Sequence, residues 1–280
     1  MLSNAPYEVP RYLLEQAKPL PRCPMAIAGA DNEVVLASVR QATEAGIITP
    51  VLIGDADIIH TDTVQSHANI ETGVRAILDA GALPVVIGGD HSINIPCIRA
   101  FDGQGAIHVL QIDAHLDFVD ERHGVRHGHG NPMRRALERD YVTGMTQVGI
   151  RNVSSTAREG YDDARAMGSD IISVRQAREM GTSGVLGHVP DGARLYVTID
   201  IDAFCPSIAP GTGTPSHGGF LYYEVLELLQ AAAQRHDIVG IDLVEVAPDY
   251  DRSGSTSILA AQILLNFLGF IFHARAEREA

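Results

Sequence analysis

The sequence is short of cysteine, of positive charge and of long apolar runs, and each shortage excludes a class of protein. Its three cysteines, Cys23, Cys97 and Cys205, are far apart, which argues against a disulfide framework. The 35 acidic residues outnumber 21 lysines and arginines, and the formal charge of −14 argues against a nucleic acid partner. No run approaches the ~20 apolar residues that span a bilayer, so we expect no membrane partner.

The size and composition suit one globular domain. A length of 280 residues with 45% hydrophobic residues is enough for a single α/β domain with a sizeable core. No repeat, low-complexity tract or linker is evident, so we predict one domain over residues 1–280. The first residues lack a positive segment followed by an apolar one, which is the pattern of a secretory leader. We therefore expect a cytoplasmic protein.

Apolar runs alternate with stretches of helical spacing along the chain. This alternation predicts an α/β fold with a mostly parallel central sheet and crossover helices. The predicted strands are residues 50–53, 83–87, 106–112, 145–150, 195–199 and 238–244. The clearest predicted helices are residues 69–80, 222–235 and 257–274.

Three short phrases rich in Asp and His follow directly on predicted strands: residues 88–92 (GGDHS), 113–117 (DAHLD) and 200–202 (DID). They contain six side chains of the metal-binding type: His91, Asp113, His115, Asp117, Asp200 and Asp202. Alternate residues of an extended segment share one face, and open α/β sheets carry their sites at the carboxyl ends of strands. A single aspartate there is as easily a solvated residue or a helix cap. The whole set favours a site for two divalent metals, and oxygen and imidazole donors without thiolate suit manganese or a similar ion.

Two long segments without a helix or strand pattern leave from these phrases, namely residues 117–132 and 203–219. Loops of this length inside a compact domain are more often functional than idle. We expect them to form the rim of the same site.

The three phrases, in this order, resemble the signatures of the ureohydrolases, the family of arginase and agmatinase. The resemblance extends through residues 209–215 (APGTGTP) and 242–248 (DLVEVAP), covers about residues 54–275, and is closest to agmatinase-like members. It implies a three-layer α/β/α fold of the arginase type, a centre of two manganese ions and a homo-oligomer, either trimer or hexamer. It also implies that His91, Asp113, Asp117 and Asp202 bind or bridge one ion, while His115 and Asp200 complete the pair.

The chemistry of a guanidino substrate gives three further residues a role. A guanidinium carbon is a poor electrophile, and two metals that share a water lower its pKa and so supply a strong nucleophile. By analogy, Asp117 orients this nucleophile and accepts its proton. Glu245 follows the strand 238–244 and can pair with two N–H groups of the substrate, unless it is an ordinary surface glutamate. The family pattern selects His129 as the group that protonates the leaving amine, with His127 as the alternative.

The predicted function is hydrolysis of agmatine or a related guanidino compound to urea and an amine. Alternatives are another C–N hydrolase of this fold, acting on formiminoglutamate or a guanidino acid, and a catalytically weak metal-binding relative. Two departures from the family bear on the substrate. Cys205 stands where the family commonly has a third aspartate. Residues 1–53 lack the usual opening, and residues 24–55 weakly resemble the β-α-β start of phosphate acetyl- and butyryltransferases, which leaves an acyl-phosphate enzyme as a remote alternative.

Overall fold

The computed structural model describes residues 23–27, 48–52 and 56–279. The chain divides into two compact units, one of Met1–Val85 with Arg275–Ala280 and the other of Val86–Ala274. The single-domain organisation stays a prediction.

The described residues of the first unit form two strands and one long helix. Strands β1 (Cys23–Ile27) and β2 (Ile48–Leu52) pair in parallel, as the predicted β-α-β unit requires. The helix expected between them, at residues 33–45, lies outside the described residues. Helix α3 (Thr63–Asp79) begins six residues before the predicted residue 69, because the Asp62 side chain accepts the Gln65 N–H at 2.9 Å and caps it there.

The second unit is built on a six-stranded sheet in the order β3-β8-β7-β4-β5-β6. Its strands are β3 (Val85–Ile87), β4 (Ile107–Ile112), β5 (Val142–Val148), β6 (Ser169–Ile172), β7 (Arg194–Asp200) and β8 (Asp237–Val244). The ladders that join β8 to β7, β7 to β4, β4 to β5 and β5 to β6 are all parallel. The predicted parallel sheet is therefore confirmed.

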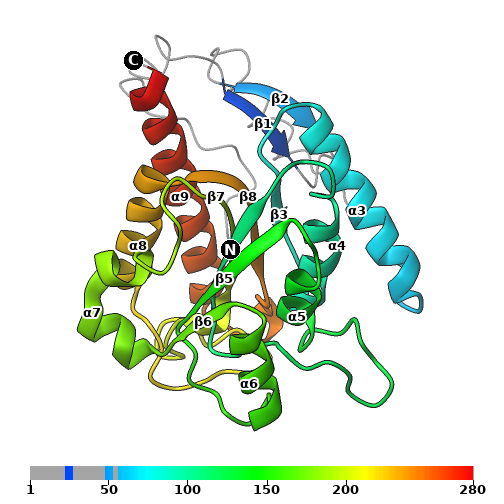
Figure 1. Ribbon diagram of the computed structural model, residues 1–280, viewed down its shortest axis with the longest axis vertical. Coiled ribbons are helices and arrows are strands. Elements are labelled where there is room, and N and C mark those ends of the chain that lie inside the picture. The colour runs from blue at the N-terminus through cyan, green and yellow to red at the C-terminus, as the bar shows by residue number, and fades with distance from the viewer. Residues whose placement is uncertain (1–22, 28–47, 53–55, 280) are drawn as a thin grey trace. The chain divides into compact units, whose positions relative to one another are not determined.

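Helices cover both faces of this sheet, which gives the three layers that the resemblance implied (Figure 1). Helices α4 (Asn94–Arg99) and α5 (Pro132–Leu137) lie on one side. Helices α7 (Val174–Leu186), α8 (Tyr222–Arg235) and α9 (Ser255–Glu279) lie on the other. The remaining helix, α6 (Arg158–Ala166), precedes β6.

The core lies along the central strands. All six residues of β4 are buried, as are all but the first residue of β7 and of β8. Strands in the middle of a parallel sheet are covered on both faces, so their sequences become nearly continuous apolar runs. This is why residues 107–112, 194–200 and 237–244 were recognisable as strands in the sequence.

Helix α9 corrects one expectation. The helix at residues 255–278 is long and apolar enough to cross a membrane by length and composition alone, with a mean hydropathy of 1.7 over an 18-residue stretch. The expectation that no segment reaches that length is therefore wrong. The core helix of a globular protein passes the same test, and Ile263 and Phe267 of α9 have no exposed surface. One side of α9 thus packs in the protein interior.

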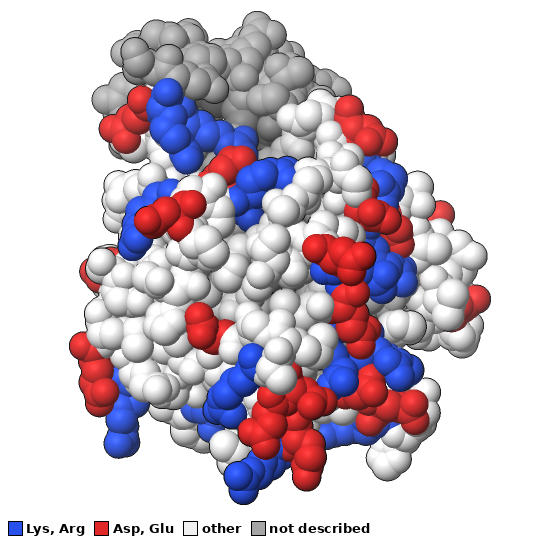
Figure 2. Space-filling model, viewed as in Figure 1, with Lys and Arg blue, Asp and Glu red and all other residues white. Residues whose placement is uncertain are grey.

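The charged side chains visible in Figure 2 are interleaved by sign. The one lysine of the chain, Lys18, lies outside the described residues, so the blue side chains are arginines. Many of them lie next to Asp or Glu, and on this face they form no continuous basic patch. Nucleic acid binding depends on such a patch, because the phosphates are neutralised by clustered Lys and Arg.

Candidate metal centre

Neighbouring strands deliver the six candidate ligands to one edge of the sheet. Asp113 follows β4 directly, and Asp200 ends β7, whose Ile199 is paired with Ile112 of β4. Asp202 lies in a single 3-10 turn (Ile201–Ala203) after β7, and His91 opens another (His91–Ile93) after β3. Because β4 and β7 are adjacent and parallel, their carboxyl ends bring these side chains together.

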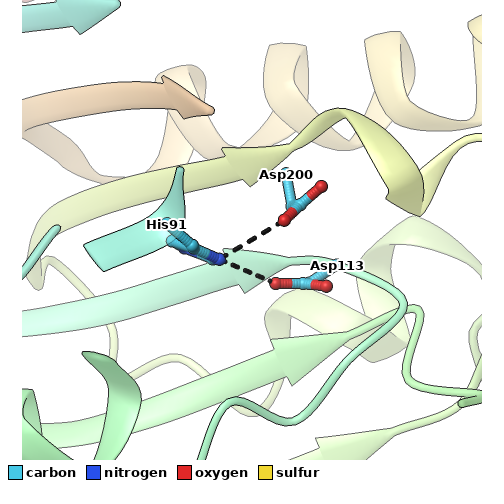
Figure 3. Close-up of side chains that lie close together, drawn as sticks. All are labelled: His91, Asp113 and Asp200. Carbon is cyan, nitrogen blue, oxygen red and sulfur yellow. Dashed lines mark ion pairs between the residues drawn. The ribbon is translucent and has the colours of Figure 1, made fainter. Parts of the chain in front are cut away.

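The side chains converge on two clusters that share Asp113. One contains His91, Asp113 and Asp200, and the other contains Asp113, His115 and Asp202, with the ligand atoms of each within 4.8 Å of one another. Figure 3 shows the imidazole of His91 pointing at the carboxylates of Asp113 and Asp200, which come from adjacent strands. This arrangement groups Asp200 with His91 and Asp202 with His115, unlike the division that the resemblance implied.

The histidine nitrogens lie within direct contact distance of the surrounding carboxylate oxygens. His91 Nδ1 lies 2.9 Å from Asp117 Oδ2, 3.1 Å from Asp113 Oδ2 and 3.4 Å from Asp200 Oδ2. His115 Nδ1 lies 2.9 Å from Asp202 Oδ2. All six predicted ligands are therefore brought together.

The local backbone is shaped to present these groups. Asp113 Oδ1 accepts the His115 N–H at 2.6 Å, and Asp200 Oδ1 accepts the Asp202 N–H at 2.8 Å, which fixes both turns. Asp117 has a φ of 51°, which is uncommon for a residue with a side chain and is found at functional sites. Gly149, with φ 100°, lies against the turn, where a Cβ would be 2.7 Å from the Asp113 carbonyl oxygen.

Burial and the neighbouring side chains shift the pKa values of the clustered Asp and His side chains. Burial raises the pKa of Asp117 to about 6, and the charge of Asp113 acts in the same direction. Burial and the neighbouring Asp202 raise the pKa of Asp200. For His115, burial disfavours the charged form, but hydrogen bonds with Asp113 and Asp202 outweigh it and raise its pKa to about 11. Buried carboxylates that repel one another are stabilised by a cation placed between them.

The donor set fits divalent metal ions. Four buried carboxylates and two imidazoles supply only oxygen and nitrogen atoms, and no thiolate is among them. The Nδ1 atom of His91 is buried and makes no hydrogen bond, although three carboxylates surround it. A lone pair directed at a metal ion accounts for a buried nitrogen of this kind.

The other predicted site residues lie beside the clusters. Glu245 is half-buried, has a φ of 64°, and accepts the backbone N–H of His91 at 2.8 Å through Oε1. Burial raises the pKa of Glu245, and the hydrogen bond from the His91 N–H acts in the opposite direction. The pKa of His127 is lowered by burial and by Arg135 and other arginines. His127 and His129 are both exposed in the loop of residues 117–132.

Comparison with known sequences decides the family. The model described as "Arginase family" matches residues 23–269. This chain belongs to the arginase family. The match begins at residue 23, so it also covers the segment 24–55 that resembles the start of the phosphate transferases. The ureohydrolase resemblance is thereby confirmed.

Named relatives of this arginase-family chain are hydrolases of C–N bonds. It is 34% identical over 222 residues to a guanidinobutyrase of Pseudomonas aeruginosa, covering 77% of this chain and 69% of that protein. It is 38% identical over 226 residues to the proclavaminate amidinohydrolase of Streptomyces clavuligerus, covering 79% and 69%. The chain is accordingly a hydrolase that acts on C–N bonds of amidines, as predicted.

Solved structures of relatives have the same fold. The proclavaminate amidinohydrolase of Streptomyces clavuligerus matches with a TM-score of 0.75 at 30% identity, covering 92% of this chain and 94% of that one. The formimidoylglutamase of Bacillus subtilis matches with a TM-score of 0.76 at 29% identity, covering 90% and 87%. The arginase-like fold is confirmed, and the dependence of this family on a binuclear metal centre agrees with the two clusters.

Sequence reasoning missed the residues that support the ligands. Arg151 donates to the carbonyl oxygen of Asp202 at 2.7 Å, and the Thr214 hydroxyl donates to Asp202 Oδ2 at 3.1 Å. Behind the ligands, Gln111 donates to Asp113 Oδ2 at 2.6 Å. Only Gln111 left a signal in the sequence, as a polar residue inside a mostly apolar strand, because such a residue is costly to bury without a partner. Cys205, the departure from the family, is partly exposed just beyond the second ligand turn.

Proposed function

We propose that this enzyme hydrolyses agmatine or a related guanidino compound to urea and an amine at a centre of two manganese ions. The supporting observation is the pair of buried ligand clusters that share Asp113, with the Glu245 carboxylate beside them. A metal pair alone is compatible with many hydrolyses. The adjacent carboxylate adds a partner for a planar cation, because it can pair with two N–H groups at once.

The six ligand side chains would hold the ions, and bound ions of this kind supply a water of lowered pKa. Asp117 Oδ2 lies 2.9 Å from His91 Nδ1, beside the cluster of His91, Asp113 and Asp200. In the proposed reaction, Asp117 orients the attacking water and accepts its proton. Its left-handed backbone directs the carboxylate into the centre.

Glu245 and His129 would act on the substrate. One oxygen of Glu245 accepts the His91 N–H, which anchors the carboxylate next to a metal ligand. Its other oxygen is left to accept N–H groups of the guanidinium and so hold the carbon over the metals. His129, exposed in the loop, then donates a proton to the leaving amine nitrogen.

The pairing of nearby arginines favours a substrate without a carboxylate. Arg126 and Arg134 are in or next to the loop of His129 and could have bound an acid group. Arg126 lies 2.8 Å from Asp120, an oxygen that it shares with Arg135, and Arg134 lies 2.6 Å from Asp163, so each already has an acidic partner. Agmatine, whose far end is an amine, needs no such partner.

A urea assay over a guanidino panel tests the proposal. Agmatine, arginine, 4-guanidinobutyrate and 3-guanidinopropionate are each incubated with the full chain, with and without added manganese. We expect manganese-dependent urea release, fastest from agmatine. Absence of urea from every compound at saturating manganese would refute the guanidino hydrolysis. Faster release from a guanidino acid would refute the choice of agmatine alone.

The similarity to a formimidoylglutamase supports a second candidate reaction. Hydrolysis of a formimidoyl group releases formamide in place of urea, so formimidoylglutamate belongs in the panel with a formamide readout. A chain that binds two manganese ions and releases neither product is the catalytically weak relative.

We also propose that the enzyme is a cytoplasmic homo-oligomer, a trimer or a hexamer. The support is the resemblance to the family and a composition without a disulfide framework. Light scattering coupled to size exclusion gives the mass of the particle, and a monomer of 30.0 kDa would contradict the oligomer.

A further inference from the structure

A row of polar side chains crosses the buried sheet, and two of them, Gln111 and Thr198, lie two residues before the ligands Asp113 and Asp200. In the register of the sheet, Gln111 of β4 is paired with Gln147 of β5 and with Thr198 of β7, and Thr198 is paired with Asp242 of β8. All four side chains have no exposed surface. Burying a polar group is costly unless it is hydrogen-bonded, so an uninterrupted row in the centre of the core requires a reason.

Two residues of the row, Thr198 and Asp242, form a chain of hydrogen bonds that ends at His91. The ring nitrogen Nε2 of His91 lies 2.9 Å from the hydroxyl of Thr198, and that hydroxyl donates to Oδ1 of Asp242. The other oxygen of Asp242 accepts the Tyr196 hydroxyl at 2.7 Å and the Asn94 amide at 2.8 Å. Asp242 thus receives three donors, which matches a carboxylate that offers no proton of its own.

The direction of these bonds fixes the protonation of the His91 ring. A threonine hydroxyl has one hydrogen, and here Asp242 takes it, so towards His91 the same oxygen can only accept. His91 must then carry its proton on Nε2, which leaves the lone pair on Nδ1. That atom faces Asp113, Asp117 and Asp200 and makes no hydrogen bond.

We propose that Thr198 and Asp242 are positioning residues that fix the tautomer and orientation of His91 for metal binding. They touch neither the substrate nor the reacting atoms. The proposal rests on the metal centre of the proposed function, and it does not depend on which substrate is hydrolysed. Partners of this kind behind a metal-bound histidine typically contribute about 10- to 100-fold to metal affinity.

The chain offers a matched set of variants. Thr198→Val keeps the shape of the side chain and removes the hydroxyl, whereas Thr198→Ser keeps the hydroxyl. Thr146 is an internal control, because it is also fully buried and also bonded to a histidine, with His108 Nε2 at 3.0 Å. Thr146→Val removes the same kind of bond from a pair that belongs to no metal cluster.

Manganese binding to the metal-free full chain is measured by calorimetric titration and by the electron paramagnetic resonance of free manganese. His91→Ala identifies the binding step that depends on His91. We expect Thr198→Val to weaken that step about 10- to 100-fold, and the step of the His115 cluster to change much less. Thr198→Ser and Thr146→Val should bind both ions like the parent.

Three results would overturn the proposal: parent-like binding in Thr198→Val, a loss in Thr198→Ser equal to that in Thr198→Val, or an equal loss in Thr146→Val. If circular dichroism shows that Thr198→Val does not fold, Asp242→Asn takes its place and must weaken the same step. A parent that binds no manganese would refute both this proposal and the metal centre. A parent that binds two ions and releases no urea would refute only the proposed reaction.

Discussion

Arg151 is predicted to hold the rim loop of residues 203–219 onto the end of β5. The five N–H groups of its guanidinium are shared among six backbone carbonyl oxygens, in residues 149, 202, 203, 204, 216 and 217. The two shortest bonds reach Ser216 at 2.6 Å and Asp202 at 2.7 Å. Removing the guanidinium leaves partly buried carbonyl groups without partners, which costs free energy.

The two short bonds give the magnitude. A hydrogen bond from a charged donor contributes about 1.5 kcal/mol or more, so Arg151→Met should lower the free energy of unfolding by about 3 kcal/mol. Arg151→Lys keeps the charge but not the planar fork of donors, and we expect it to lose about half as much.

Urea denaturation followed by circular dichroism at neutral pH measures both losses. The control is Arg122→Met, because the exposed Arg122 donates to a single carbonyl, that of Ser155. We expect a loss there below about 0.5 kcal/mol. A loss below about 1 kcal/mol in Arg151→Met, or equal losses in the two methionine variants, would refute the role of Arg151.

Three further predictions concern substrate binding, proton transfer and acid stability. Glu245→Gln should lower kcat/KM by about 100-fold or more, because the negative charge that pairs with the guanidinium is lost. Elemental analysis should still find two metal ions in this variant, and unchanged kinetics would contradict the role of Glu245. His129→Asn should lower kcat about 100-fold or more and His127→Asn only slightly, and the reverse order would exchange the two assignments. Asp251 has a lowered pKa, because the Ser253 hydroxyl and the N–H of Thr256 bond to its carboxylate. Its contribution to stability should thus be complete above its unfolded pKa of about 3.9 and be lost as the pH falls further. Asp251→Asn should therefore make the Tm fall less steeply at acid pH. An unchanged fall of Tm in that variant would show that Asp251 plays no part.

Much of the site could be predicted from the sequence, because each ligand phrase follows a central strand. Strands covered on both faces are apolar throughout, so the runs before Asp113, Asp200 and Glu245 stood out, and their ends could be located. The left-handed backbones of Asp117 and Glu245 left no signal in the residue types.

The order of the strands could not be predicted, and it decides how the ligands are grouped. The carboxylates of Asp113 and Asp200 meet because β4 and β7 are neighbours, although about 80 residues separate them in the chain. Strand β6 was missed, since Ser169–Ile172 is short, lies at the edge of the sheet and begins with two polar residues. Helices α4 and α5 were missed because six residues are too few to show a periodic pattern.

The sharing of Asp113 by both clusters is the central claim, and counting metal ions per chain tests it most directly. Elemental analysis after manganese loading and desalting should give two ions in the parent, one in His115→Ala, and none or close to none in Asp113→Ala. Two ions retained in Asp113→Ala, or none bound by the parent, would contradict the shared centre.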